Sequence, residues 1–359
     1  MADPNGLTPP SPEHLRRPRY RGTHPRRFDE KYKEHDPGRY EETVGKVLAS
    51  GKTPAGMHRP VMVKEILEVL SPAPGELAVD CTLGYGGHAQ EILPRLDPGG
   101  RLIGLDADPI ELPKTEVRLR ALGFGEDIFV ACRSNFAGLP RLLADPKVGR
   151  TGSGADIILA DLGVSSMQID DPVRGFSVKR EGPLDMRMNP ERGQPASAWL
   201  SRISPAALSE ILVENSDEPY ASVLAPALAG RTFQSTRELS SAIRSALPRL
   251  APDAAELSVR RVFQAIRIEV NDEFSALDTF LRNLKFCLNP NGRVAILTFH
   301  SGEDRRVKKA FAAGLAEGFY GGISHEVLRP GAEERNSNPR SSPAKLRWAR
   351  RAAELAATK

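Results

Sequence analysis

Apolar positions in the first half of the chain form short buried runs separated by amphipathic stretches. The run VMVKEILEVL (61–70) spaces its apolar residues as one face of a helix does, and SPAPG (71–75) ends it. A second helix is predicted to begin at HAQEILPRL (88–96). Because helical segments separate the apolar runs, the pattern predicts a parallel sheet with helices on both faces. Its first four strands are expected at 76–84, 101–108, 128–136 and 155–163.

The middle of the chain has a different pattern. It is rich in Ala, Ser, Leu and Arg, and helical stretches such as ALSEILVENS occur there without a clear strand. A long amphipathic helix is then predicted over 269–288, followed by a buried strand over 293–300. Since the strand pattern resumes after the helical stretch, the sequence predicts a discontinuous α/β domain that an inserted helical domain interrupts. The α/β domain is expected over 57–170 and 263–350, and the insertion over 171–262.

Composition narrows the class of protein. The chain has 359 residues, of which 40% are hydrophobic and 27% charged, as is typical of a globular protein with more than one domain. No run approaches the roughly 18 apolar residues of a membrane span, and the N-terminus has no signal-peptide core. Cys81, Cys132 and Cys287 match neither the spacing of a zinc site nor a disulfide framework. We therefore expect a cytoplasmic protein without a metal site or membrane partner.

The segment 1–56 is rich in Pro, Arg and His and lacks an apolar period. We interpret it as a flexible basic N-terminal extension. Contact with RNA phosphates and a tail without a specific role are both compatible with this composition.

The candidate chemistry lies in the loop between the first strand and the next helix. Gly84, Gly86 and Gly87 permit backbone angles that other residues avoid, and they let a ligand approach the main chain. The following helix presents free N–H groups at its start. Asp106 ends the second strand 22 positions after Gly84, close to the ~20 expected of a ribose-binding acid. The pattern predicts a site for a ligand that resembles a nucleotide.

The order of residues in this loop distinguishes two classes of cofactor. A dinucleotide fingerprint reads G-x-G-x-x-G and binds a pyrophosphate, whereas this loop reads Gly84-x-Gly86-Gly87 after Asp80. An acidic side chain would oppose a pyrophosphate but suits a ligand that bears a sulfonium and an ammonium group. The loop therefore favours S-adenosylmethionine over NAD.

Two more positions fit the same pocket. Phe136 follows the third strand, where its ring would pack on an adenine face or serve as a core aromatic. Asp161 ends the fourth strand, where its carboxylate would face both cofactor and acceptor or belong to a loop at the edge of the core.

Longer motifs then follow one another along the chain: HRPVMVKEIL, DCTLGYGGH, LIGLDADP, DLGVSSMQIDDPVRGFS, GPLDMRM, FQAIRIEVNDE and FHSGEDRRVK. Together they resemble the bacterial small-subunit ribosomal RNA (cytosine-N4) methyltransferases, the MraW-like family, from about His58 to Arg350. The resemblance implies a Rossmann-like class I methyltransferase sheet with an inserted helical domain for substrate recognition. It further implies S-adenosyl-L-methionine as cofactor and methylation of the exocyclic amine of a cytidine in the decoding region.

The resemblance also assigns residues and partners. The cofactor-binding positions that it implies are Gly86, Gly87, His88, Asp106, Phe136, Asp161 and Gln168. Gln168 rests on the resemblance alone, because its spacing marks only a polar loop residue. The implied partner is small-subunit ribosomal RNA or the small ribosomal subunit. A homodimer and a monomer are both compatible with the sequence.

The chain departs from the family pattern at a few places. Gly302 stands where the family usually has Leu, and Ser216-Asp217-Glu218-Pro219 replaces a G-E-E-R stretch and so loses its arginine. The segment between FHSGEDR and NPRSSPAKLR is shorter than in many relatives, and the N-terminal extension is unusual. These departures bear on substrate docking rather than on the cofactor loop.

Methyl transfer from a sulfonium is a direct displacement, so the protein mainly aligns the acceptor nitrogen with the methyl carbon. We hypothesise that Asp161 is catalytic, because it or nearby main-chain carbonyls would accept hydrogen bonds from the cytosine amine. Methylation at cytosine C5 would instead need a cysteine nucleophile, and none of the three cysteines follows the fourth strand in a Pro-Cys or Thr-Cys loop.

Basic clusters around Phe263 and after His300 are candidates for contacts with RNA phosphates, although each also fits a solvated face. His300 itself fits either a place near the base or the edge of the core. Two rival functions remain: a methyltransferase that acts on a small molecule or protein, and a non-catalytic RNA-binding assembly factor. The basic residues concerned are Arg260, Arg261, Arg267, Arg305, Arg306, Lys308 and Lys309.

Overall fold

The computed structural model describes residues 60–150 and 153–353, so the basic extension predicted for 1–56 lies outside the described part. Within these ranges a seven-stranded sheet has the order β3-β2-β1-β4-β5-β7-β6. In the same ranges, no helix combines the length and apolar character needed to cross a membrane. The strands are β1 (Leu77–Asp80), β2 (Arg101–Asp106), β3 (Phe129–Arg133), β4 (Ala155–Asp161), β5 (Leu288–Thr298), β6 (Tyr320–Ile323) and β7 (Lys345–Arg351).

The first five strands are parallel, as the sequence predicts. One edge of the sheet differs from these strands, because β7 runs antiparallel between β5 and β6 there. The sequence of β7, KLRWARR, alternates basic and apolar residues and therefore does not resemble the continuous apolar runs of the central strands. This strand order and the single reversed strand make the fold a Rossmann-like α/β sheet of the class I methyltransferase type.

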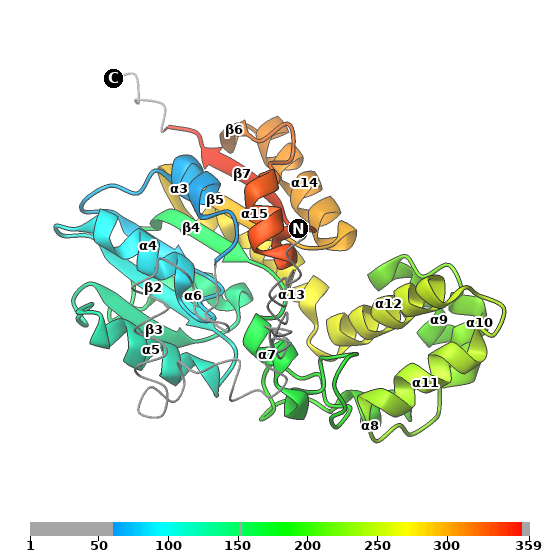
Figure 1. Cartoon of the computed structure of the whole chain (residues 1–359). Helices are drawn as coiled ribbons and strands as arrows, with labels where there is room; N and C mark the ends of the chain where they lie inside the picture. Colours follow the sequence, from blue (N-terminus) through cyan, green and yellow to red (C-terminus); the bar gives the residue numbers. More distant parts are fainter. Residues whose placement is uncertain (1–59, 151–152, 354–359) are drawn as a thin grey trace, which may run out of the picture. The chain divides into compact units, whose positions relative to one another are not determined.

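Helices cover both faces of the sheet (Figure 1). Because side chains alternate along a strand, Leu77 and Val79 belong to one buried cluster and Ala78 to the other. The first cluster packs under α6 (Leu139–Ala144), α13 (Glu273–Cys287) and α14 (Ser301–Ala316). The second packs under α3 (Val63–Leu70), α4 (Gly87–Leu96) and α5 (Glu111–Ala121).

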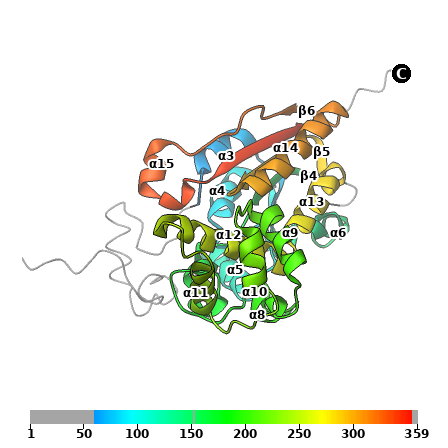
Figure 2. The ribbon, with the colours of Figure 1, turned by 90° about the vertical axis from the view of Figure 1, so that its right-hand side faces the viewer.

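A third hydrophobic cluster is built by helices between β4 and β5, and Figure 2 shows α9, α10, α11 and α12 gathered together. Leu208, Leu224, Leu239 and Val262, one from each of these helices, are fully buried in it. The segment therefore has a core of its own. Its helices are α8 (Ala196–Leu200), α9 (Pro205–Ser216), α10 (Ala221–Leu228), α11 (Thr236–Ala246) and α12 (Pro252–Val270).

The helix predicted over 269–288 is confirmed over Glu273–Cys287, but its predicted start is wrong, because α12 ends at Val270 and α13 begins at Glu273. The apolar period continues across the junction, but Asp272 adopts a left-handed backbone with φ 52°. The Asn271 side chain fixes the break: its Nδ2 donates to the Met186 carbonyl at 2.8 Å, and its Oδ1 accepts from Met188 N at 2.7 Å. A side chain that bonds distant main chain is not visible in an apolar pattern.

Candidate active site

A cavity of about 490 Å³ opens at the carboxyl ends of β1, β2, β4 and β5. Ligands of Rossmann-like sheets bind at this edge. Six of the seven predicted site residues line the cavity, and Gly86 lies beside it as the N-cap of α4. The six are Gly87, His88, Asp106, Phe136, Asp161 and Gln168.

The glycine loop has the conformation that its sequence predicts. Gly84 and Gly86 have φ of +48° and +77°, in the region that favours glycine. A Cβ at Gly86 would also lie only 3.0 Å from Thr115 Cγ2 of α5, so the loop packs closely on that helix. These two glycines let the chain turn from β1 into α4 beneath the cavity.

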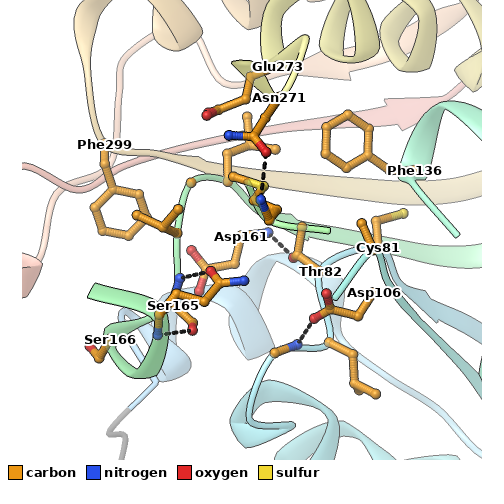
Figure 3. A pocket seen from close by; sticks show the side chains of 18 of the residues that line it. Cys81, Thr82, Asp106, Phe136, Asp161, Ser165, Ser166, Asn271, Glu273 and Phe299 are labelled. Carbon is orange, nitrogen blue, oxygen red and sulfur yellow. Dashed lines mark hydrogen bonds between the residues drawn. The ribbon is translucent and has the colours of Figure 1, made fainter. Parts of the chain in front are cut away.

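Asp106 holds this loop. Its Oδ2 accepts from Gly84 N at 2.8 Å (Figure 3), and its Oδ1 accepts from Asp108 N at 2.8 Å. Burial raises the pKa of Asp106 to about 6, against which the two main-chain bonds act. Each carboxylate oxygen can accept more than one hydrogen bond, so capacity remains for ligand hydroxyls. Asp80 has a different place: it is buried and does not line the cavity, and its Oδ1 accepts from Thr82 N at 3.1 Å.

Asp161 lies at the end of β4 with its carboxylate in the cavity wall (Figure 3). Its Oδ1 is buried and has no hydrogen-bond partner within the described residues. Burial, and then the negative charge of Glu303, raises the pKa of Asp161 to about 7. A buried acceptor without a partner costs free energy, which a ligand donor would recover.

His88 and Gln168 are tied to the protein. His88 Nε2 contacts the Val61 carbonyl oxygen at 2.9 Å, and its Nδ1 lies 3.7 Å from Asp161 Oδ2. Gln168 Nε2 donates to Asp108 Oδ2 at 2.8 Å, while Gln168 Oε1 accepts from Ser165 N at 2.9 Å. Ser165 and Gln168 form a capping box on α7 (Ser166–Asp170). The Gln168 side chain thus keeps one N–H for any ligand.

Sequence reasoning missed the buried pair that Asp108 forms with Arg174. Arg174 Nη1 donates to Asp108 Oδ2 at 2.8 Å, and Arg174 Nη2 donates to the Met188 carbonyl at 2.8 Å. The guanidinium therefore joins the turn after Asp106 to the loop that Asn271 also holds. Both residues belong to motifs of the family, LDADP and DPVRGFS, but spacing along the chain does not reveal that they meet.

Arg174→Met should reduce the free energy of unfolding by about 3 kcal/mol, because it leaves the Asp108 carboxylate buried without its cation. The Asp108 side chain is only 1% exposed, so water cannot replace the guanidinium. Urea unfolding monitored by circular dichroism measures the change. As a control, Arg237→Met breaks the exposed Arg237–Glu181 pair and should cost less than about 1 kcal/mol. Equal losses in the two variants would contradict the structural role of Arg174.

Aromatic side chains lie on either side of Asp161 in Figure 3, Phe136 toward Asp106 and Phe299 toward Ser165. The Phe136 ring packs against Phe280 at 5.4 Å between centroids. It is therefore both a core aromatic and a wall of the cavity, and the two interpretations of this residue are compatible.

A buried polar cluster forms another part of the cavity wall, and sequence reasoning missed most of it. Arg267 donates through Nε and Nη2 to both carboxylate oxygens of Glu273 at 2.8 Å. Glu303 Oε2 accepts from Phe299 N at 2.8 Å, and its carboxylate lies 3.1 Å from His300 Nε2. Burial alone would raise the pKa of Glu303, but His300 and Arg267 lower it overall. The predicted phosphate contact of Arg267 is disfavoured, since Glu273 occupies its guanidinium.

Gly302 explains one departure from the family pattern. A Cβ at Gly302 would lie 2.6 Å from Cζ of Phe274, whose ring lines the cavity and stacks under the Arg306 guanidinium at 3.7 Å. The glycine lets this aromatic ring sit against the first turn of α14. The chain therefore fills with Phe274 the space that a larger residue at position 302 would need.

Gly302→Ala should destabilise the protein by about 1–2 kcal/mol, because the clash with Phe274 outweighs the roughly 1 kcal/mol gained in helix propensity. Thermal unfolding of the single variant measures this loss. Phe274→Leu shortens the opposing side chain, so the double variant should recover part of it. Strictly additive effects of the two substitutions would contradict the proposed contact.

The remaining basic candidates differ in their availability. Arg305 pairs with Asp217 at 3.2 Å, in the stretch that departs from G-E-E-R, and Arg306 pairs with Asp278 at 3.4 Å. The side chains of Arg260, Lys308 and Lys309 are exposed. These three, rather than the paired arginines, are best placed for a partner in solution.

The cavity is acidic, and the predicted cofactor must be compatible with that charge. Asp106, Glu111, Asp161, Glu273 and Glu303 line it, against the guanidinium groups of Arg267 and Arg340. Oε2 of Glu111 is buried without a hydrogen-bond partner within the described residues. This wall opposes a pyrophosphate and suits a ligand that carries positive charge and donor groups. S-adenosylmethionine, with its sulfonium, ammonium and ribose hydroxyls, fits that requirement.

Some solved structures are distantly similar to this chain. TrmN from Thermus thermophilus aligns with a TM-score of 0.38 and 14% identity, over 81% of this chain and 48% of that one.

Sequence comparison gives closer relatives. The chain is 47% identical over 347 residues to ribosomal RNA small subunit methyltransferase H 1 of Lachnoclostridium phytofermentans. This alignment spans 94% of this chain and 93% of the relative. It is 48% identical over 343 residues to ribosomal RNA small subunit methyltransferase H 2 of Alkaliphilus metalliredigens, over 93% and 97% of the two chains. The model of the MraW methylase family matches residues 55–352. On this evidence, and with a methyltransferase-type sheet and an acidic cavity at its carboxyl edge, the chain belongs to the MraW methylase family.

Proposed function

We propose that this protein transfers a methyl group from S-adenosylmethionine to the N4 amine of a cytidine in the decoding region of small-subunit ribosomal RNA. The observation that carries the proposal is the unpartnered Oδ1 of Asp161 in the wall of an acidic cavity. The names of the relatives support ribosomal RNA of the small subunit as the acceptor. The choice of atom and base rests on the motif DLGVSSMQ and on chemistry.

The cofactor would lie over the glycine loop. Asp106 would accept hydrogen bonds from the ribose hydroxyls, and Phe136 would pack on the adenine. Main-chain N–H groups at the start of α4, near Gly87 and His88, would hold the carboxylate end. The cofactor supplies a methyl group already activated on a sulfonium.

Asp161 would act on the acceptor. The cytosine amine is a poor nucleophile because its lone pair is shared with the ring. A carboxylate that accepts its N–H groups favours a pyramidal nitrogen and stabilises the positive charge that develops during attack. The Asp161 side chain is only 21% exposed, and its low-dielectric surroundings strengthen this interaction relative to water.

Residues 171–262 would serve as the domain that recognises the RNA. The separate hydrophobic cluster of their helices supports this role. The target base must leave its stack to reach a buried carboxylate, so binding surfaces outside the cavity have to hold the flanking strand. Arg260 on α12 and Lys308 and Lys309 on α14 are our candidates for phosphate contacts.

Labelled S-adenosylmethionine tests the acceptor class. Unmethylated small subunits, free ribosomal RNA and assembled ribosomes should be incubated with the enzyme in parallel, at several salt concentrations. We expect label in the RNA, with binding that weakens steeply as salt rises because phosphate contacts release counterions. Label in protein or in a small molecule would contradict the proposal. Failure to bind S-adenosylmethionine in calorimetry would point to a non-catalytic assembly factor.

A further inference from the structure

The imidazole of His88 has both nitrogens directed at protein atoms. Nε2 contacts the Val61 carbonyl oxygen at 2.9 Å. A carbonyl only accepts, so Nε2 carries the hydrogen and Nδ1 of the neutral ring presents its lone pair. That lone pair lies 3.7 Å from Asp161 Oδ2, and the His88 side chain is only 8% exposed. The ring is therefore arranged to receive a proton on the side of Asp161.

Asp161 connects this ring to the cavity. Its Oδ2 is the oxygen nearest the imidazole, whereas its Oδ1 is buried without a hydrogen-bond partner in the described part of the chain. Its main chain is fixed as well, because Asp161 N donates to Thr82 Oγ1 at 2.6 Å. One carboxylate thus has an oxygen open to a ligand donor and another oxygen facing an unprotonated nitrogen.

Methylation of an amine releases a proton. The lone pair of the cytosine N4 forms the new N–C bond, and the C–S bond breaks with its electron pair remaining on sulfur. The nitrogen then bears a positive charge and loses one N–H proton to regain its lone pair. A carboxylate that already accepts the N–H bond is the immediate acceptor of that proton.

We propose that His88 then receives this proton from Asp161, once the carboxyl group has rotated to turn its protonated oxygen toward Nδ1 and the 3.7 Å gap has closed to hydrogen-bond distance, and so returns the carboxylate to its ionised form. His88 is then a positioning residue that acts through Asp161. This inference rests on the proposed function of Asp161.

Carboxylates from several elements surround the His88–Asp161 pair. The carboxylates that bear on the pair come from separate elements: Asp80 on β1 and Glu303 on α14. Asp80 interacts with both His88 and Asp161. No cation of the described residues makes an ion pair with Asp161 other than His88, so the imidazole is the group that can balance its charge.

His88→Gln tests the proposal, because a glutamine amide can still donate to the Val61 carbonyl but cannot take a proton. We expect single-turnover methyl transfer to slow by about tenfold, while the dissociation constant of S-adenosylmethionine changes by less than about threefold. The rate of the variant should reach half of its maximum at a lower pH than the rate of the wild type does. The exposed His325 provides a matched control, since His325→Gln should change neither the rate nor its pH dependence.

A double-mutant cycle distinguishes this role from a purely structural one. If His88 acts through Asp161, His88→Gln should have no further effect on the rate in an Asp161→Asn background. The same factor in both backgrounds would overturn the proposal, and so would loss of cofactor binding in His88→Gln alone. Nucleoside analysis of the same reactions separates the role of His88 from the proposed function. If N4-methylcytidine forms but the effects of the His88 and Asp161 substitutions are independent, only the role of His88 is overturned.

Should His88→Gln fail to fold, nitrogen NMR of the histidine-labelled wild type tests the same role without that variant. We expect a hydrogen on Nε2 of His88 and a titration of its Nδ1 signal that shifts in Asp161→Asn. A titration that is identical in the two proteins, or a hydrogen on Nδ1 at neutral pH, would overturn the proposal.

Discussion

Asp161→Asn should lower the single-turnover rate of methyl transfer by about 10²–10³-fold, with little change in cofactor affinity. Asparagine has nearly the same shape but no charge, so it stabilises the developing positive charge on nitrogen poorly and cannot accept the proton. The amide can still accept one hydrogen bond, which accounts for a residual rate. Rapid-quench assays with labelled cofactor and calorimetry measure the two quantities.

The pH dependence of the wild-type enzyme should follow the same carboxylate. Since the pKa of Asp161 is raised to about 7, its ionised and active form accumulates as pH rises through that value. The rate should therefore fall below neutral pH, and Asp161→Asn should lose this acid limb.

Stability should change in the opposite direction to activity. A carboxyl group whose pKa is raised in the folded state stabilises the protein below its unfolded pKa, near 4, and that contribution is lost as pH rises through about 7. Asp161→Asn removes a buried charge above neutral pH, so its melting temperature at pH 8 should equal or exceed that of the wild type. A variant that is both slow and markedly less stable would indicate that Asp161 is structural.

Asp106→Ala should weaken the binding of S-adenosylmethionine by about 10²-fold or more. The substitution removes the proposed acceptor for the ribose and also releases Gly84 N and Asp108 N, which the carboxylate holds at 2.8 Å. Hydrogen bonds to a charged group contribute about 1.5–3 kcal/mol each, and 1.4 kcal/mol corresponds to a tenfold change in affinity. Isothermal titration calorimetry measures the dissociation constant.

Asp127 offers a matched control for this prediction. It is an exposed acid in the turn before β3 and does not line the cavity, so Asp127→Ala should bind the cofactor as the wild type does. Unchanged affinity in Asp106→Ala would contradict the placement of the cofactor over the glycine loop.

The parts of the fold that were predicted correctly are those that rest on local patterns. The central strands were found because each is a continuous apolar run before a turn, as in the run that ends at Asp161. Asp106 and the glycine loop were paired from their spacing, since a βαβ unit has a nearly fixed length. The hydrogen bond between Asp106 and Gly84 confirms that these residues meet.

The missed features depend on contacts between distant segments. Asn271 divides a continuous apolar period by bonding to Met186 and Met188, more than 80 positions earlier. Arg174 and Asp108 meet across 66 positions, and Arg267 appeared as a surface cation although Glu273 holds it in the cavity wall. Neither periodicity nor charge pattern encodes which polar groups become partners once the chain has folded.

The placement of β7 in the sheet also depends on contacts between distant segments. Its basic residues find specific partners, because Arg347 Nε donates to Asp304 Oδ1 at 2.6 Å and Lys345 Nζ donates to Asp304 Oδ2 at 3.3 Å. These ion pairs with α14 permit charged residues in a strand next to the core. The same basic residues obscure the strand pattern of this segment in the sequence.

Mass spectrometry of nucleosides tests the central claim most directly, namely that Asp161 presents a cytosine amine to the methyl donor. RNA methylated by the purified protein should be digested completely and its modified nucleosides separated. We predict that N4-methylcytidine appears with the wild type and falls by about 10²–10³-fold in initial rate with Asp161→Asn. Formation of 5-methylcytidine, or of N4-methylcytidine at an equal rate in the two proteins, would contradict the claim.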